Sequence, residues 1–198
     1  PTETIDSYFD SLTKYLPEEQ KKELKVKFSR FKAIAEARSR INLIAFDIYD
    51  HFINYCVPKG LKAMVVCSSR GVAVEMFNVL KTMQGINPRV VISFSDKQEG
   101  DDDDSTSSAV KKIKEYHEKM VKPLFGDNDE KYDESVCEDF KNPEGEINML
   151  IVKDKLLTGF DAPIAGVLYL DKSIKEHSLV QAVARVNRVY KDKDFGLI

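Results

Sequence analysis

The sequence lacks the features that define several common classes of protein. Its 198 residues include no tryptophan and only three cysteines, and the cysteines do not have the spacing of metal ligands. No apolar run approaches the roughly 20 residues that a membrane-spanning helix needs, and the polar, acidic start is unlike a signal peptide. Cys56 and Cys67 lie in apolar surroundings, so we expect buried free thiols and a reducing, cytoplasmic compartment.

Complete catalytic motifs are also absent. The sequence contains no G-x-x-x-x-G-K-[ST], G-x-G-x-x-G, C-x-x-C or H-E-x-x-H. No expected strand ends in the acid pair of a Mg-ATP site, and three scattered histidines suggest no Ser-His-Asp arrangement. A self-sufficient active site of these kinds is therefore excluded. Because the chain starts without methionine and ends within the apolar letters FGLI, we expect a piece of a larger protein.

Charge is distributed unevenly along the chain. The net charge is −3, but the segment from Asp96 to Glu146 holds 17 acidic residues and 8 lysines, whereas the remainder carries +6. A partner that is a polyanion must therefore meet the remainder, with the acidic middle facing away. Asp101 to Asp104 form an unbroken acidic run, for which a solvated loop is the expectation.

Periodicity predicts a helical segment followed by an α/β domain. Residues 2–57 are expected to be helical almost throughout, with one apolar stripe. After the break at Pro58, further helices are expected over 72–83 and about 108–121, and a last one is capped by Ser178. The region 123–143 is expected to be rich in loops, with a short helix over 135–140. Apolar runs predict strands over 61–67, 90–94, 147–152 and 166–171, and the letters Gly196 to Ile198 start a last one.

Uninterrupted apolar strands separated by helices are typical of a parallel sheet covered on both faces. The sequence therefore predicts a three-layer α/β/α domain with a mainly parallel sheet over residues 58–198, preceded by a helical segment over 1–57. Its acidic middle spans 95–146. The first two strands and the helix between them should form one right-handed βαβ unit.

The stretch from Leu156 to Tyr190 contains the main candidate site. A turn with the letters TGFDAP follows a strand, and a later helix presents Gln181, Arg185 and Arg188 within an arc of about 60°. Guanidinium groups suit phosphate, although a solvated arginine face explains the spacing equally well. The opposite side is apolar and predicted to be core: Ala182, Val183, Val186 and Val189.

Polar residues also follow the first two expected strands. Ser68, Ser69 and Arg70 follow the first strand, and Ser93 and Ser95 lie at the end of the second. Open α/β sheets bind ligands at the carboxyl ends of their strands, so these side chains could bind phosphates there. For Ser93 and Ser95, simple capping of a strand end is at least as good an explanation.

These residues, in this order, resemble a known family. A strand entering T-G-x-D-x-P, a second strand, and a helix with Q-x-x-x-R-x-x-R resemble motifs V and VI of the superfamily 2 helicase and translocase core. LIVKDKLLTGFDAP followed by LVQAVARVNRVY is closely similar to the motor (R) subunit of type I restriction enzymes. INLIAFDIYDHF and GLKAMVVCSSRGVAVEMF are similar to the entry and motif IV of its second RecA-like lobe. The resemblance covers roughly 39–94 and 148–198.

The resemblance implies half of an ATP site. In such motors ATP lies between two RecA-like lobes, and the first lobe supplies the phosphate loop and the acids that hold Mg²⁺. Arg185 and Arg188 match the arginine-finger positions, and Gln181 matches a polar residue near the nucleotide. Gly159 and Asp161 match motif V, where Asp161 is expected near the ribose or an arginine; a turn cap is its alternative role. Ala184 stands where many relatives have glycine.

The resemblance also implies partners. Thr158, together with Ser68, Ser69, Arg70 and Ser93, is expected at the phosphates of double-stranded DNA, where contacts are independent of base sequence. Further partners would be the first lobe and nuclease domain of the same subunit and the modification and specificity subunits, with no membrane involved. Two alternatives remain: the same lobe of another superfamily 2 helicase, and a non-catalytic α/β adapter domain.

Overall fold

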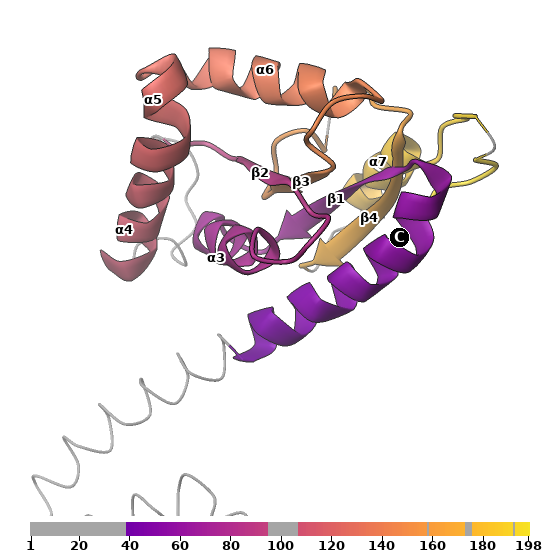
Figure 1. Cartoon of the computed structure of the whole chain (residues 1–198), viewed down its shortest axis with the longest axis horizontal. Coiled ribbons are helices and arrows are strands. Elements are labelled where there is room, and N and C mark those ends of the chain that lie inside the picture. Colours follow the sequence, from indigo (N-terminus) through magenta and orange to yellow (C-terminus); the bar gives the residue numbers. More distant parts are fainter. Residues whose placement is uncertain (1–38, 95–106, 158, 173–175, 192) are drawn as a thin grey trace, which may run out of the picture. The chain divides into compact units, whose positions relative to one another are not determined.

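The computed structural model describes residues 39–94, 107–157, 159–172, 176–191 and 193–198. They form a three-layer α/β/α domain of the RecA-like kind, whose four strands are all parallel and lie in the order β2-β3-β1-β4. Figure 1 shows α3 on one side of the sheet and α6 on the other. The predicted fold class is confirmed.

The domain begins with helical structure. Residues 41–51 are helical, and a π-helical turn, η1 (Phe52–Cys56), and a 3-10 turn, η2 (Val57–Lys59), complete the segment. Its buried side chains recur every three or four residues and join the core of the sheet: Ile41, Ala45, Ile48, Phe52 and Cys56. The compact unit that includes the sheet comprises Ile41–Ile198, and Pro1–Arg40 do not belong to it. The predicted boundary at residues 57 and 58 stays a prediction.

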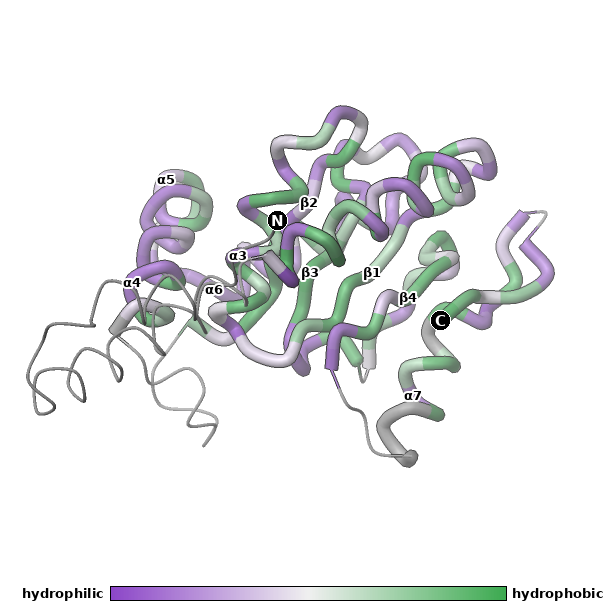
Figure 2. The backbone as a smooth tube through the Cα atoms, turned by 90° about the horizontal axis from the view of Figure 1, so that it is seen from below, coloured by the Kyte–Doolittle hydropathy of each residue, from purple (hydrophilic) through white to green (hydrophobic). Residues whose placement is uncertain are grey.

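The four strands match the predicted apolar runs with small shifts. They are β1 (Lys62–Cys67), β2 (Pro88–Val91), β3 (Met149–Val152) and β4 (Ala165–Asp171). Val65 pairs with Ile151 on one side and Tyr169 on the other, so β1 is central. Figure 2 shows hydrophobic colours along β1 and β3, and both strands are fully buried, as parallel strands between two helical layers must be.

Two details of the sheet differ from or extend the prediction. The strand expected to reach Phe94 ends at Val91, and β3 lies between β1 and β2, so the first βαβ unit joins strands that are not neighbours. The predicted last strand appears as a parallel bridge between Val167 and Leu197 beside β4. Cys56 and Cys67 are buried thiols outside any disulfide, as expected, and burial raises the pKa of the Cys56 thiol to about 11.

Helices connect and flank the strands. The helix α3 (Arg70–Leu80) follows β1, and α7 (Glu176–Val186) follows β4. Between β2 and β3 lie α4 (Ser107–Tyr116), the π-helical η4 (His117–Val121), α5 (Lys122–Phe125) and α6 (Asp129–Lys141). The acidic run of Asp101 to Asp104 lies outside the described residues.

The prediction of a loop-rich region over 123–143 was wrong, because α6 occupies thirteen residues of it. The Asn128 side chain caps its start by accepting a hydrogen bond from the Lys131 amide, and acids fill its first turn, where the helix dipole favours negative charge. Its buried side chains, Tyr132, Val136 and Phe140, recur every four residues. The sequence prediction gave more weight to the many acidic residues of this region than to the four-residue spacing of its apolar side chains.

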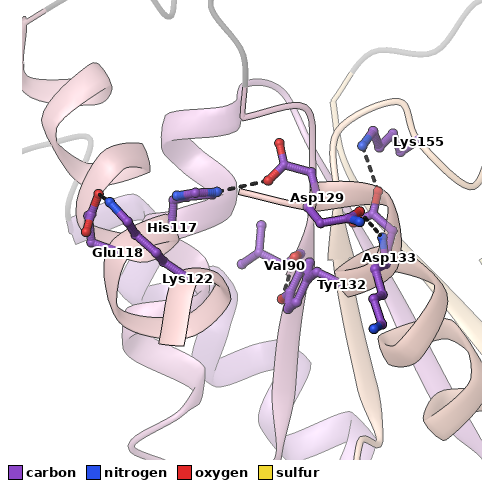
Figure 3. Close-up of polar contacts among 10 residues, drawn as sticks. Val90, His117, Glu118, Lys122, Asp129, Tyr132, Asp133 and Lys155 are labelled. Atoms are coloured by element: carbon purple, nitrogen blue, oxygen red, sulfur yellow. Dashed lines mark hydrogen bonds and ion pairs between the residues drawn. The ribbon is translucent and has the colours of Figure 1, made fainter. Parts of the chain in front are cut away.

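Two tyrosines, Tyr116 of α4 and Tyr132 of α6, form hydrogen bonds with the outer edge of β2, and Figure 3 shows Tyr132 beside Val90. The Val90 amide donates to the Tyr116 hydroxyl over 2.9 Å, and the Tyr132 hydroxyl donates to the Val90 carbonyl over 3.0 Å. The two hydroxyl oxygens lie 2.7 Å apart, so Tyr116 donates to Tyr132. Burial raises the pKa of both phenols, which keeps them protonated. Among the described residues no strand pairs with this edge, and the two tyrosines bond the polar groups of Val90 instead.

We expect Tyr132→Phe to lower the free energy of unfolding by about 1–3 kcal/mol, because the buried Val90 carbonyl loses its donor and the Tyr116 hydroxyl loses its acceptor. Urea unfolding of the domain measures the change. Tyr49→Phe is the matched control, since the Tyr49 hydroxyl has no hydrogen-bond partner among the residues that the structure describes. Equal stability of the two variants would contradict this role of the hydroxyl pair.

Candidate functional site

The end of β1 carries three of the predicted residues in different environments. The Ser68 side chain is exposed. Ser69 is buried, and its hydroxyl oxygen accepts a hydrogen bond from the Val72 amide over 3.1 Å, which makes it the N-cap of α3. Arg70 is also buried and donates to the Ser93 carbonyl over 3.1 Å. Of the three, Ser68 is therefore the side chain that solvent or a ligand reaches.

The contact between Arg70 and Ser93 joins the ends of β1 and β2, although β3 separates these strands in the sheet. Ser93 is half-buried and follows β2 by two residues. Its backbone carbonyl, rather than its hydroxyl, accepts this bond. Ser95 lies outside the described residues, and its predicted role stays a prediction.

The loop after β3 contains the TGFDAP turn and two residues with left-handed backbone. Leu156 has a φ of 69° and Gly159 a φ of 74°. The first costs about 1–2 kcal/mol for a side-chain-bearing residue, and the second suits glycine. No atom lies within 4 Å of where a Cβ of Gly159 would be, so space is open around this backbone. Phe160 is buried and anchors the loop, whereas Thr158 lies outside the described residues.

Asp161 and Arg188 connect this loop to the segment after α7. The Arg188 Nη1 atom lies 3.0 Å from Asp161 Oδ2, and both side chains are about half exposed. The pair brings together the two predicted halves of the site, the TGFDAP turn and the arginine segment. The Arg188 guanidinium keeps donors for a further acceptor, because it has five and one carboxylate oxygen takes only part of them.

The predicted helical face with Gln181, Arg185 and Arg188 needs correction. The helix α7 ends at Val186, so Arg188 is not on it. Gln181 is half-buried on the helix; Arg185 also lies in α7, but its side chain is not described. The helix starts at Glu176, so the predicted N-cap Ser178 is inside its first turn.

The apolar side of α7 was predicted only in part. Ala182 and Val186 are fully buried, but Val183 is 36% exposed and Val189 is 85% exposed. Val189 points to solvent because the chain has left the helix: the Asn187 side-chain oxygen accepts from the Gly196 amide and fixes the turn back towards β4. Helical spacing cannot be extended across that turn.

A buried lysine that the sequence did not reveal holds the turn together. Lys193 Nζ donates to the backbone carbonyls of Pro163, Ala165 and Val186, over 2.6, 2.9 and 3.0 Å. It therefore ties the TGFDAP turn to the start of β4 and to the last residue of α7. Burial lowers the pKa of Lys193. Within the letters KDKDFG, nothing distinguishes this lysine from its neighbours.

A second set of charges lies around the start of the same loop. Lys172, after β4, contacts the Asp154 carboxylate and donates to the Lys153 carbonyl over 3.2 Å. Lys155 Nζ lies 2.7 Å from Asp133 Oδ2 of α6 (Figure 3). Asp133 is mostly buried, and burial raises the pKa of its carboxyl, although the hydrogen bond from Lys155 opposes that rise.

The helix α7 and the segment after it carry hydrogen-bond donors. Arg188 and Gln181 offer guanidinium and amide N–H groups, which bind phosphate oxygens. Within the described segments, no group of three or more His, Cys, Asp or Glu side chains could hold a metal ion. None of the helices in these segments is long and apolar enough to cross a bilayer.

Comparison with known proteins decides the family. A family model described as type I restriction enzyme subunit R domain 3 matches residues 59–198. The chain belongs to this family. The match includes the acidic middle and α6, which the resemblance from motifs had left out.

Similar proteins are also named as subunits of type I restriction enzymes. The chain is 35% identical over 198 residues to the MjaIXP protein of Methanocaldococcus jannaschii, and 29% identical over 192 residues to the HindI protein of Haemophilus influenzae. The names of both describe a type I restriction enzyme endonuclease subunit. These matches cover 99% and 95% of this chain but only 17% and 16% of the relatives, so the chain spans about a sixth of their length.

We expect Asp133→Asn to leave the melting temperature at pH 7 unchanged or slightly raised. Because the folded-state pKa lies above the unfolded value, the charged carboxyl costs stability at pH values above the folded pKa. That cost disappears as the pH falls through the folded pKa towards the unfolded value of about 4. Thermal melts of both proteins at pH 7 and pH 4 test this: any advantage of the variant should shrink at pH 4. A variant that melts well below the wild type at pH 7 would contradict it.

Proposed function

We propose that this chain is the second motor lobe of the R subunit of a type I restriction endonuclease. In the complete subunit it would contribute Arg185 and Arg188 to ATP hydrolysis, and DNA-phosphate contacts to translocation along double-stranded DNA before cleavage. The first lobe, outside this chain, would supply the phosphate loop and the acids that hold Mg²⁺. The nuclease domain and the modification and specificity subunits would complete the machine.

The observation that carries this proposal is the ion pair of Asp161 and Arg188, because it unites the two segments that the motor family uses at ATP. A guanidinium held by one carboxylate is oriented in advance and still has donors for a phosphate oxygen. In phosphoryl transfer, negative charge spreads over the transferred group, and fixed positive charge next to it stabilises the transition state. Gln181 would bind near the nucleotide from α7.

DNA contacts would come from the ends of the strands and the loop after β3. Ser68 is exposed at the end of β1, and the open space at Gly159 lets a phosphate approach its backbone. Thr158 would add a hydroxyl. Ser69, Arg70 and Ser93 would act mainly by fixing the geometry of this edge, since Ser69 caps α3 and Arg70 binds Ser93. Such contacts read no base and weaken as salt rises.

In the full-length subunit we expect Arg188→Ala to lower DNA-stimulated ATP hydrolysis about 10³-fold or more, the effect of losing an arginine finger. Steady-state phosphate release measures it. Lys114→Ala, which removes an exposed positive charge on α4, is the control and should hydrolyse ATP like the wild type. Circular dichroism should be the same for all three proteins. An unchanged hydrolysis rate in Arg188→Ala would remove Arg188 from this role.

The chain alone should show no ATP hydrolysis above background, because the proposed site is completed by another lobe. Phosphate release by the purified 198-residue chain, with Mg²⁺ and DNA present, tests this half-site directly. Turnover that persists through purification and disappears in Arg188→Ala would mean that the chain carries a whole site.

A further inference from the structure

The helix α6 contacts the loop 155–160 on both sides of its Thr-Gly dipeptide. Before the dipeptide, Asp133 of α6 binds Lys155, with 2.7 Å between Oδ2 and Nζ. Figure 3 shows these side chains reaching towards each other from α6 and from the chain after β3. The two residues are 22 positions apart in sequence, so this contact belongs to the tertiary fold.

After the dipeptide, the contact is aromatic. The rings of Phe140, in the last turn of α6, and Phe160 have centroids 6.2 Å apart, and Lys141 Nζ lies 5.2 Å from the centre of the Phe160 ring. Both phenylalanines are buried. The helix therefore fixes the two ends of the loop by different chemistry, an ion pair at one end and ring packing at the other.

The loop needs such support because of its backbone. Leu156 and Gly159 both have left-handed φ angles, and this conformation is unfavourable for Leu156 because it has a side chain. A strained segment keeps its shape only when its surroundings fix it. Lys155 directly precedes Leu156, and Phe160 directly follows Gly159, so the α6 contacts bracket the two unusual residues.

The ion pair is expected to add little to folding stability. Asp133 Oδ1 is buried and has no hydrogen-bond partner within the described residues, and burial outweighs Lys155 in its effect on the pKa of Asp133. Pairs that are buried and only partly satisfied contribute little to folding and can even oppose it. A carboxylate kept at this cost, and bound to the first residue of the loop, suggests a positioning role.

We propose that α6 is the positioning element for the loop 155–160, and that Asp133, acting through Lys155, sets where this loop meets its ligand. The inference rests on the proposed function: the loop would be the DNA-contacting part of the lobe, joined to the ATP site through Asp161 and Arg188. In that setting α6 makes ATP hydrolysis respond to DNA. Asp133 is a positioning residue and touches neither DNA nor ATP.

A double-mutant cycle in the full-length subunit, assembled with its partner subunits, tests this. The variants are Asp133→Asn, Lys155→Gln and the double variant, and the readouts are kcat with saturating DNA and the DNA concentration for half-maximal stimulation. We expect each single variant to lower the DNA-stimulated kcat about tenfold, since small displacements of such a loop have effects of this order or larger. The double variant should resemble either single variant, because both residues act through one contact.

Two controls separate positioning from damage to the fold. Glu134→Gln removes the neighbouring, exposed acid of α6 and should match the wild type in both readouts. The melting temperature of Asp133→Asn should stay at or above that of the wild type; a parallel loss of melting temperature and kcat would mean that Asp133 is merely structural and would overturn the inference.

The remaining outcomes distinguish the two proposals. If DNA does not stimulate hydrolysis by the wild-type subunit, the proposed function fails, and the inference fails with it. If DNA stimulates the wild type and Asp133→Asn equally, the proposed function stands and the role of α6 is wrong. If the double variant lowers kcat by the product of the two single effects, Asp133 and Lys155 act independently, and the positioning role of α6 is also overturned.

Discussion

All four strands run in the same direction, and the candidate site depends on that constraint. Parallel pairing brings the carboxyl ends of β1, β2, β3 and β4 to one edge, so residues that are far apart in sequence follow strands that end together. The bond between Arg70 and the Ser93 carbonyl joins the ends of β1 and β2, and the contact between Lys172 and Asp154 joins the ends of β4 and β3; in each case another strand lies between the two. Strand order, more than any single motif, decides which polar groups meet.

Two buried lysines then attach the surrounding segments to the sheet. Lys62, the first residue of β1, donates to the carbonyls of Asp139, Asn142 and Gly145 at the end of α6, and Lys193 does the same for the turn, β4 and α7. Each ammonium has three donors and meets three carbonyl oxygens, so its hydrogen-bonding capacity is used in full. Desolvation lowers the pKa of both lysines, and the bonds to carbonyls compensate for removing the charge from water.

The sequence predicted what depends on local patterns and missed what depends on tertiary contacts. Apolar runs located all four strands, because a strand buried on both faces must be apolar throughout. The period of Tyr132, Val136 and Phe140 was present but was outweighed by the acids around it. The place of Arg188 could not be foreseen, since the end of α7 depends on Lys193 and Asn187, which act across turns. The contact of Asp133 could not be foreseen either, because Asp133 lies on α6 and its partner Lys155 follows β3.

Tyr116 and Tyr132, which bond Val90 of β2 from α4 and α6, make the two edges of the sheet different: the β2 edge is closed and the β4 edge is open. On the closed side, Pro88 has no amide hydrogen, its carbonyl accepts a bond from Arg89, and the polar groups of Val90 are taken by Tyr116 and Tyr132. On the open side, Leu197 already bonds to the backbone of Gly166 and Leu168. Within the part of the chain that the structure describes, the edge left for an added extended segment is thus the one beside β4, where such a segment would compete with the stretch around Leu197.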